Sequence, residues 1–232
     1  MRRVTTSDEL REALHGTDSE IVLADGLYQG TFAVPRSLVL RAENIWKAHL
    51  FGGVSDCLSI NASGVKVSGL RVSAAFWMGI RFQRTENTTI EDCWVHSCGK
   101  SGLLGDGTNH AIQRNLIERN GLTVWDHGLY ICGSKLTIRD NVFRHNSGWG
   151  LHGYSGKAAV DVSDSAVLGN IAYGHREKVG LGLWTARRCL VLHNQAWNNA
   201  RNVEIHDNDG SNLVAGNVER DLGRWPLNAR PE

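Results

Sequence analysis

The chain has 232 residues, of which 41% are hydrophobic and 21% are charged, and its formal net charge is +1. This balance gives no electrostatic reason to expect a nucleic-acid partner or an acidic membrane surface. No apolar run approaches the ~18 residues of a membrane span, and the start "MRRVTTSDEL" lacks the apolar segment of a signal peptide. We therefore expect a cytoplasmic protein as the chain is written, or an extracellular or periplasmic one if a signal peptide was removed.

Glycine is frequent and proline is rare, with 26 and 3 residues respectively, which favours many tight turns over a disordered linker. The five cysteines are odd in number and form no CxxC pair: Cys57, Cys93, Cys98, Cys132 and Cys189. We expect them to be free buried thiols and not a disulfide or metal framework.

The N-terminal segment 1–19 predicts a short capping helix. Thr6 and Glu9 have the spacing of a capping box, and Leu10 with Leu14 forms one apolar face. The adjoining stretch "EIVLADGLYQGTFAVPRSLVLRAEN" alternates as short strands do and predicts the first coil of a repeat array.

From residue 65 onward one pattern recurs. An alternating apolar stretch ends in Asn or a small residue, and a second apolar stretch comes immediately after it. These anchors are 24, 22, 26, 29, 24 and 23 residues apart: Gly69, Cys93, Asn115, Asn141, Asn170, Asn194 and Asn217. A Gly-Leu or related pair lies ahead of most anchors. Each repeat is therefore predicted to form three short strands separated by turns.

A repeat of this length with three strands predicts one coil of a single-stranded parallel β-helix, and the chain holds roughly eight coils. Successive coils stack at ~4.8 Å, so inward residues form columns. The predicted columns are Ile80, Leu103, Leu129, Leu151, Leu183 and Val203 in one strand, and Val95, Ile117, Phe143, Ala172 and Ala196 in another.

The anchor asparagines are expected to stack as well, because their amides can satisfy backbone groups at the bend and each other. The main rivals explain less. A leucine-rich repeat needs a denser leucine signature, and an antiparallel sandwich does not explain Asn at one phase of each repeat. We expect a single all-β domain over residues 1–232, with 218–232, including Trp225, as a C-terminal tail or cap. So small a cap leaves room for a partner subunit.

The repeats resemble those of the pectate-lyase-like right-handed parallel β-helix superfamily over nearly the whole chain. The stretches "SEIVLADGLYQGTF" and "SLVLRAEN" resemble the opening coil of polysaccharide lyases and alginate-type epimerases, and "HGLYI" and "GWGLH" resemble repeats of carbohydrate-active members. The chain has neither the DPHD-type motif of mannuronan epimerases nor the paired-Asp motifs of polygalacturonases. The resemblance implies a ligand groove along the first strand of each coil.

Alternation identifies the outward residues of that strand. The first predicted column is Arg81, Leu104, Tyr130, His152, Trp184 and Glu204. The second is Gln83, Asp106, Cys132, Tyr154, Ala186 and His206, and the loop edge carries Trp77, Lys100, Asp126, His127, Trp149 and Lys178. Five rungs of the stack span roughly 20 Å, which suits a few sugar rings.

We expect the catalytic residues to be His152, Tyr130, Tyr154, His206 and Glu204. In a uronate lyase or C5-epimerase, His152 would be the base and a neighbouring Tyr the acid, since these side chains suit proton transfer beside a carboxylate. Arg81, Asp126, His127, Trp149 and Trp184 are expected to bind substrate, with Arg81 on a carboxylate and the tryptophans on sugar faces. For Asp126 and His127, formation of a turn is an equal alternative.

No metal or cofactor is expected. The stretch "HDNDG" begins like a calcium loop through Asp207 and Asp209, but the rest of the loop does not follow. His110, His145, His175 and His193 are expected to be solvated residues of turns or other faces.

The leading hypothesis is therefore an enzyme acting on an acidic oligo- or polysaccharide. Two others stay open: a small-molecule isomerase or cyclase on the same scaffold, and a non-catalytic sugar-binding solenoid. The oligomeric state is open too, as a monomer or an end-to-end or side-by-side homo-oligomer.

Overall fold

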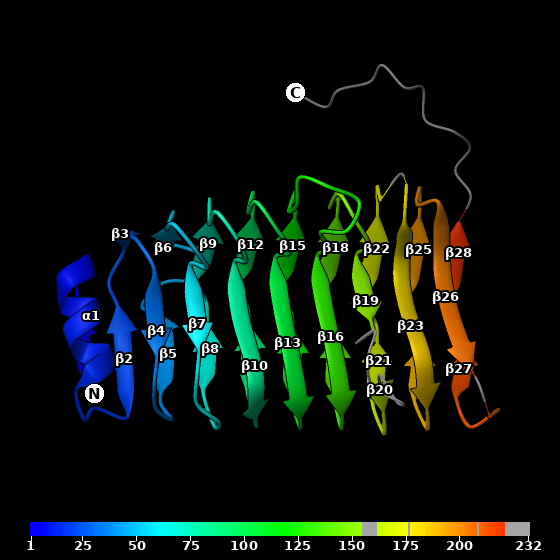
Figure 1. Cartoon of the computed structure of the whole chain (residues 1–232), viewed down its shortest axis with the longest axis horizontal. Coiled ribbons are helices and arrows are strands. Elements are labelled where there is room, and N and C mark those ends of the chain that lie inside the picture. The colour runs from blue at the N-terminus through cyan, green and yellow to red at the C-terminus, as the bar shows by residue number, and fades with distance from the viewer. Residues whose placement is uncertain (155–161, 176, 208, 221–232) are drawn as a thin grey trace, which may run out of the picture.

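The computed structural model describes residues 1–154, 162–175, 177–207 and 209–220. Its strands form three parallel sheets that wind as a β-solenoid of about nine turns, close to the coil number expected (Figure 1). Period-2 alternation places one side of each strand inside, because successive side chains point to opposite faces. Among the described residues, no helix has the length and apolar character needed to cross a membrane.

Sheet A contains the strands that lead into the asparagine anchors. Its members are β1 (Arg2–Val4), β2 (Glu20–Leu23), β5 (Val39–Ala42), β8 (Lys66–Ser68), β11 (Thr89–Glu91), β14 (Ala111–Gln113), β17 (Thr137–Arg139), β21 (Ala166–Leu168), β24 (Leu190–Leu192) and β27 (Leu213–Ala215).

Sheet B contains the strands that come after those anchors. Its members are β3 (Gly26–Gln29), β6 (Ala48–Phe51), β9 (Arg71–Ser73), β12 (Trp94–His96), β15 (Leu116–Glu118), β18 (Val142–Arg144), β22 (Ile171–Tyr173), β25 (Gln195–Trp197) and β28 (Val218–Arg220).

Sheet C contains the strands of the predicted groove, at the front of Figure 1. Its members are β4 (Phe32–Val34), β7 (Leu58–Ile60), β10 (Ile80–Glu86), β13 (Leu103–Thr108), β16 (Leu129–Ser134), β19 (Leu151–Gly153), β20 (Val162–Ser163), β23 (Val179–Arg187) and β26 (Arg201–Asp207).

The anchor asparagines form the expected ladder inside the bend between sheets A and B. Asn115, Asn141, Asn170 and Asn194 are at most 2% exposed. The Asn115 amide donates to Asn141 Oδ1 at 2.9 Å and to the carbonyl of Ile90 at 2.9 Å. The same two bonds recur at Asn141, Asn170 and Asn194, ending on Asn217. Each amide therefore satisfies a backbone carbonyl of the preceding coil and bonds to the asparagine of the next coil.

A second ladder, which the sequence pattern did not predict, lies where sheet B ends. Asn120 Nδ2 donates to Asn146 Oδ1 at 3.0 Å, and Asn146 Nδ2 lies 3.2 Å from His175 Nε2. His175 Nδ1 lies 2.8 Å from Asn199 Oδ1, so the imidazole replaces one asparagine of the ladder. The prediction that His175 is solvated is wrong, since it is fully buried.

His110 is also buried and not solvated, at the bend between sheets C and A. It is 1% exposed. Its Nδ1 accepts the backbone N–H of Thr88 at 3.1 Å, and its Nε2 lies 3.2 Å from the Asp106 carbonyl oxygen. His145 and His193 are exposed, as expected.

The residue before each ladder position has a left-handed backbone. Arg114 and Asp140 precede the first ladder with φ of 54° and 58°, and Arg119 and His145 precede the second with φ of 51° and 54°. A left-handed residue changes the direction of the chain sharply, so the side chain of the next residue points inward. The bends therefore recur at the same place in coil after coil.

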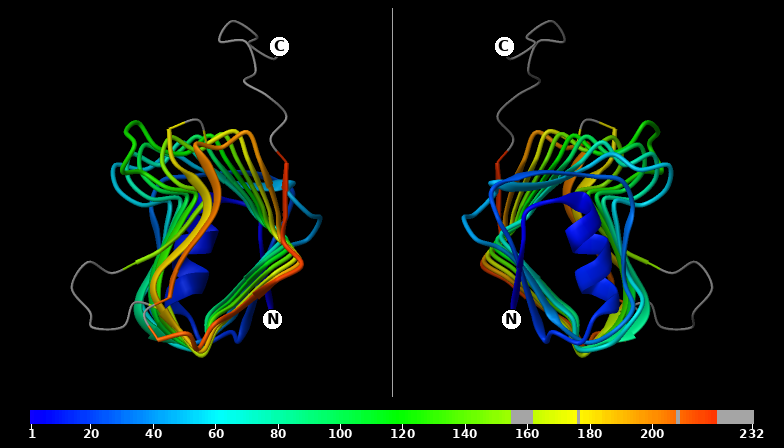
Figure 2. Two further views of the ribbon diagram at one scale, coloured as in Figure 1. Left: turned by 90° about the vertical axis from the view of Figure 1, so that its right-hand side faces the viewer. Right: turned by 90° about the vertical axis from the view of Figure 1, so that its left-hand side faces the viewer.

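The helix α1 (Ser7–His15) crosses the N-terminal end of the stack, as Figure 2 shows. Both bonds of the predicted capping box are present between Thr6 and Glu9, and Leu10 and Leu14 are buried against the first coil. The first strand already lies at Arg2–Val4, inside the segment expected to be cap. At the other end Val218–Arg220 still form a strand, and Trp225 lies outside the described residues.

As expected, none of the five cysteines forms a disulfide and four are buried, but Cys132 is only partly buried. The predicted inward columns are confirmed with one exception. Leu151 pairs with Leu181 and not with Leu183, and Leu181 pairs with Val203. The repeated Gly-Leu of Gly180–Leu183 allows both registers, and a shift by two residues keeps the same face inward.

We predict that Asn141→Ala lowers the free energy of unfolding by at least about 2 kcal/mol, because it leaves buried amides of the ladder without partners. Urea unfolding at neutral pH measures this. Asn61→Ala, at an exposed position, is the control and should change stability little. Equal stability of the two variants would contradict the structural role of the ladder.

Candidate functional site

The outward face of sheet C brings most of the predicted catalytic residues together over its last four rungs. Tyr130 pairs with His152, His152 with Gly182, and Gly182 with Glu204. Leu183 pairs with Gly153 and with Ile205, so Trp184 lies between Tyr154 and His206. The two-residue register difference thus moves Trp184 out of the first predicted column and into the second, where Ala186 was expected.

Gly182 is the residue that makes room for Trp149. A Cβ on Gly182 would lie 2.1 Å from Trp149 Cζ3, so the indole occupies the space a side chain would fill. Trp149 is 7% exposed and stacks on His152 with ring centroids 4.2 Å apart. It therefore supports His152 from one side, where an open sugar platform was expected.

His152 is enclosed by aromatic rings. Tyr130 stacks on it at 5.2 Å and 12° between planes, and Tyr154 at 5.4 Å and 22°. Together with Trp149 these rings leave His152 8% exposed. Contacts of this kind fix the orientation of an imidazole through packing.

A hydrogen-bond chain fixes the protons of His127 and His152. The backbone N–H of Trp149 donates to His127 Nδ1 at 3.0 Å, so that nitrogen carries no proton. Neutral His127 then carries its proton on Nε2, which lies 3.1 Å from His152 Nδ1. His152 Nδ1 is consequently an acceptor, and the proton of neutral His152 is on Nε2.

This arrangement gives His152 a different role from the base expected from the sequence. A base needs an available nitrogen lone pair. The lone pairs of His127 Nδ1 and His152 Nδ1 already accept hydrogen bonds. Burial, with His152 as a second cause, lowers the pKa of His127 to about 3. His127 therefore stays neutral at physiological pH, and the proton of neutral His152 lies on Nε2.

His206 has the same tautomer, but its proton is held by a carboxylate. Its Nε2 lies 2.9 Å from Glu204 Oε1, and a carboxylate oxygen is an acceptor. Neutral His206 therefore carries its proton on Nε2, which leaves Nδ1 as the basic nitrogen. The side chain is 48% exposed, while that of Glu204 is 15% exposed. Arg201 Nη1 reaches the same Glu204 oxygen at 2.6 Å.

Trp184 connects the two histidines. Its ring lies 5.2 Å from Tyr154 and 5.0 Å from His206, measured between centroids. Tyr154, Trp184 and His206 therefore form a continuous row on the surface, with His152 beside Tyr154. A phenol, an aromatic face and a carboxylate-oriented imidazole within one row are the components of a site for proton transfer on a ring-shaped substrate.

Asp126 shapes its loop. Its Oδ2 accepts the backbone N–H of Leu122 at 3.1 Å and that of Thr123 at 2.8 Å, and Lys100 Nζ lies 3.4 Å from Oδ1. The side chain is 6% exposed. Asp126 therefore stabilises a turn. His127 instead contacts the aromatic side chains around His152.

Arg81 lies outside the cluster, two rungs from Tyr130 through Leu104. Its Nε lies 2.5 Å from Oδ2 of Asp56, which is 1% exposed. Asp56 was not predicted from the sequence. The available signal was its place two residues before the inward Leu58, the position that His127 occupies before Leu129.

Metal ligands do not gather in the described part of the chain, where no group of three or more His, Cys, Asp or Glu is arranged to hold an ion. In the stretch that begins like a calcium loop, Asp209 accepts the backbone N–H of Ser211 at 3.1 Å and lies 3.7 Å from Arg187.

The comparisons with known proteins agree with this architecture. A family model described as "Right handed beta helix region" matches residues 47–196, and the chain belongs to this family. No curated protein matches the sequence.

Several solved structures share the fold. An alginate lyase from Paenibacillus sp. str. FPU-7 is 15% identical at a TM-score of 0.65, over 94% of this chain and 95% of that one. A double mutant of the periplasmic alginate epimerase AlgG is 12% identical at 0.65, over 94% and 55%. Pectin methylesterase PemA from Erwinia chrysanthemi is 11% identical at 0.60, over 97% and 91%. The chain thus has distant structural similarity to carbohydrate-active β-helix enzymes, and identities this low establish the fold alone.

We predict that acid weakens the fold through its buried histidines. Burial lowers the pKa of His127 to about 3 and that of His175 to about 4, so the unfolded chain binds protons first as the pH falls. The stabilisation is complete above pH ~6.5 and is lost toward the folded-state pKa values, at about 2 kcal/mol for each histidine between pH ~7 and ~5.

Urea unfolding of the wild type and of His175→Asn as a function of pH measures this effect. Asn occupies the equivalent ladder position in neighbouring coils, so the variant keeps the hydrogen bonds and removes one titrating group. Its stability should depend less steeply on pH. Identical slopes for the two proteins would contradict the role assigned to His175.

Proposed function

We propose that the protein is an acid–base enzyme that acts on a uronate polysaccharide, as a lyase or a C5-epimerase. The observation that carries this proposal is the row in which the phenol of Tyr154 and the Glu204-bound imidazole of His206 lie on either side of Trp184. The fold shared with an alginate lyase and an alginate epimerase supports the substrate class.

The reacting sugar lies over Trp184, between Tyr154 and His206. The centroid distances of 5.2 and 5.0 Å on either side give a row about two ring widths long. An indole face suits the C–H bonds of a pyranose ring. Substrate-binding residues are then Trp184 and Arg201, which contacts Glu204 beside His206 and whose side chain is 69% exposed. Arg81, held by Asp56 several rungs away, belongs to a more distant subsite.

His206 is the base of the reaction. Its Nδ1 takes the proton from C5, next to the uronate carboxylate, and Glu204 stabilises the imidazolium that forms, as the orienting partner of a catalytic histidine does. The electron pair left on C5 is delocalised into the carboxylate. Arg201 shares Glu204 Oε1 with His206 and is exposed enough to pair with that carboxylate as its charge grows.

Tyr154 is the acid. In a lyase the electron pair forms the C4–C5 double bond, the C4–O4 bond breaks, and the Tyr154 hydroxyl protonates the leaving oxygen. In an epimerase the hydroxyl returns a proton to C5 on the opposite face. The neutral His152 stacks on Tyr154 and Tyr130 and positions both phenols, which is the role that its fixed tautomer and burial support.

The experiment that tests the function is incubation of the purified protein with alginate, pectate, glycosaminoglycans and glucuronans. Ultraviolet absorbance detects the unsaturated ends that a lyase makes, and proton NMR detects a changed uronate ratio without cleavage. One of these signals is expected. A protein that leaves every one of these polymers unchanged by both methods would remove the proposal.

We predict that His206→Gln and Tyr154→Phe each lower kcat by about 10²- to 10⁴-fold, the usual contribution of one acid or base. Both side chains lie on the outward face of sheet C, so urea unfolding should show stability near that of the wild type. His193→Gln is the matched control, because His193 is also exposed but lies at the bend between sheets A and B. Full activity of His206→Gln would contradict its assignment as the base.

A further inference from the structure

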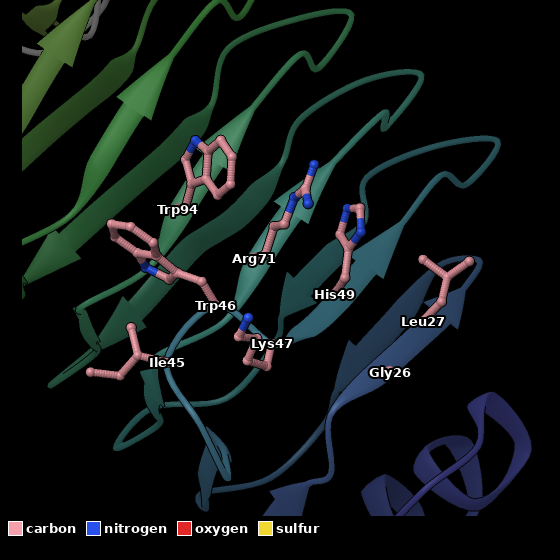
Figure 3. Close-up of a pocket in the computed structure, with 8 residues that line it drawn as sticks. All are labelled: Gly26, Leu27, Ile45, Trp46, Lys47, His49, Arg71 and Trp94. Atoms are coloured by element: carbon pink, nitrogen blue, oxygen red, sulfur yellow. The ribbon is translucent and has the colours of Figure 1, made fainter.

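A hollow of about 470 Å³ lies on the outward face of sheet B, near the N-terminal end of the stack (Figure 3). It is formed by β3, β6, β9, β12 and the turn before β6, whereas the site on sheet C lies in later coils. Its lining residues are Gly26, Leu27, Ile45, Trp46, Lys47, His49, Arg71 and Trp94. Among them are two cations and no carboxylate, so the hollow is positively charged although the chain is nearly neutral overall.

Trp46 is held in place with its ring partly exposed. Its backbone is left-handed, with φ of 64°, as it is at the bends of other coils. Its Nε1–H donates to the carbonyl of Asp92 at 2.8 Å, and the residue is 39% exposed. The ring lies 5.7 Å from that of Trp94. The side chain is therefore fixed before any ligand arrives, which lowers the entropy cost of binding.

Arg71 is oriented by two neighbours. Its guanidinium carbon lies 4.5 Å from the centre of a Trp94 ring, and its Nε–H donates to His96 Nε2 at 3.0 Å. Among contacts with the described residues, this hydrogen bond uses one of its five N–H groups. The terminal nitrogens keep the fork geometry that matches a carboxylate.

The histidines beside Arg71 add no charge at neutral pH. Burial, with Arg71 as the second cause, lowers the pKa of His49 and of His96 to about 4. His49 Nε2 lies 2.7 Å from Ser73 Oγ, and neutral His96 accepts from Arg71. The positive charge of the hollow therefore comes from Lys47 and Arg71, with Leu27 and Ile45 as exposed apolar groups at its edge.

We propose that this hollow is a second, non-catalytic binding site for an acidic sugar. Arg71 and Lys47 bind the carboxylate of a uronate, and Trp46 stacks on its ring. The choice of a uronate rests on the proposed function, while the positive charge and the fixed aromatic face are independent of it. Because the site lies on another sheet, it anchors a polymer chain without occupying the row around Trp184.

The test uses isothermal titration of tetramers of mannuronate, guluronate and galacturonate into a His206→Gln background, in which the tetramers are not consumed. Trp46→Ala and Arg71→Gln should each weaken one class of binding sites at least about tenfold, the loss usual for a central aromatic or arginine contact. Lys47→Gln is the third variant and should weaken the same sites. Because Lys47 lies in a turn, this variant tests the proposal even if Arg71→Gln alters the fold. Trp197→Ala, which removes an aromatic elsewhere on sheet B, should bind as the parent does. Neutral maltotetraose should bind far more weakly.

Failure of this inference is distinguishable from failure of the proposed function. Unchanged titrations of the Trp46 and Arg71 variants would overturn the second site even if the wild type degrades or epimerises a uronate polymer. Loss of binding in those variants would support it even in a protein without turnover. Binding of a single-stranded oligonucleotide that Arg71→Gln abolishes, with all three uronate tetramers ignored, would overturn the ligand class.

Discussion

The buried amide ladders are the constraint on which the rest of the structure depends. A parallel β-helix must change the direction of its chain at three bends in each coil. Each bend buries backbone groups that need hydrogen-bond partners. Here a left-handed residue turns the chain, and the next Asn, for example Asn115 after Arg114, satisfies a backbone carbonyl of the preceding coil and bonds to Asn141 of the following one. The ladders thereby fix where each strand starts, and so which side chains of sheet C share a row.

The strand register set by the ladders brings the side chains of the candidate site on sheet C into contact. His152 faces outward at a fixed height because Leu151 pairs with Leu129 and Leu181. This register places the Trp149 ring over Gly182. It also brings the Trp149 N–H within hydrogen-bond distance of His127 Nδ1. A slip of one residue would turn these side chains into the core, and a slip of two would separate His152 from the indole that covers it.

The sequence allowed the fold to be predicted, because alternation and the anchor asparagines repeat in nearly every coil. The alternation of inward and outward residues was enough to predict that one sheet face carries Tyr130, His152, Tyr154, Glu204 and His206. The place of Trp184 did not, since the two Gly-Leu pairs before it fit either of two registers. Nor did the burial of His175, because a histidine in place of a ladder asparagine has no sequence signature. Proton positions depend on contacts such as Trp149 N–H to His127, between residues 22 apart in the chain.

Burial and a neighbouring carboxylate give the histidines of one sheet face different roles in the proposed mechanism. Near the core, desolvation lowers the pKa of His127 to about 3 and removes that imidazole from proton exchange at working pH. Toward the exposed end of the row, a carboxylate holds the proton of His206 on the nitrogen away from the substrate. Under the proposed function, the same residue type is thus a fixed, buried side chain in one place and a base in the other. Glu204 supplies that difference, and removing its charge by Glu204→Gln should impair the base while leaving the His127–His152 pair intact.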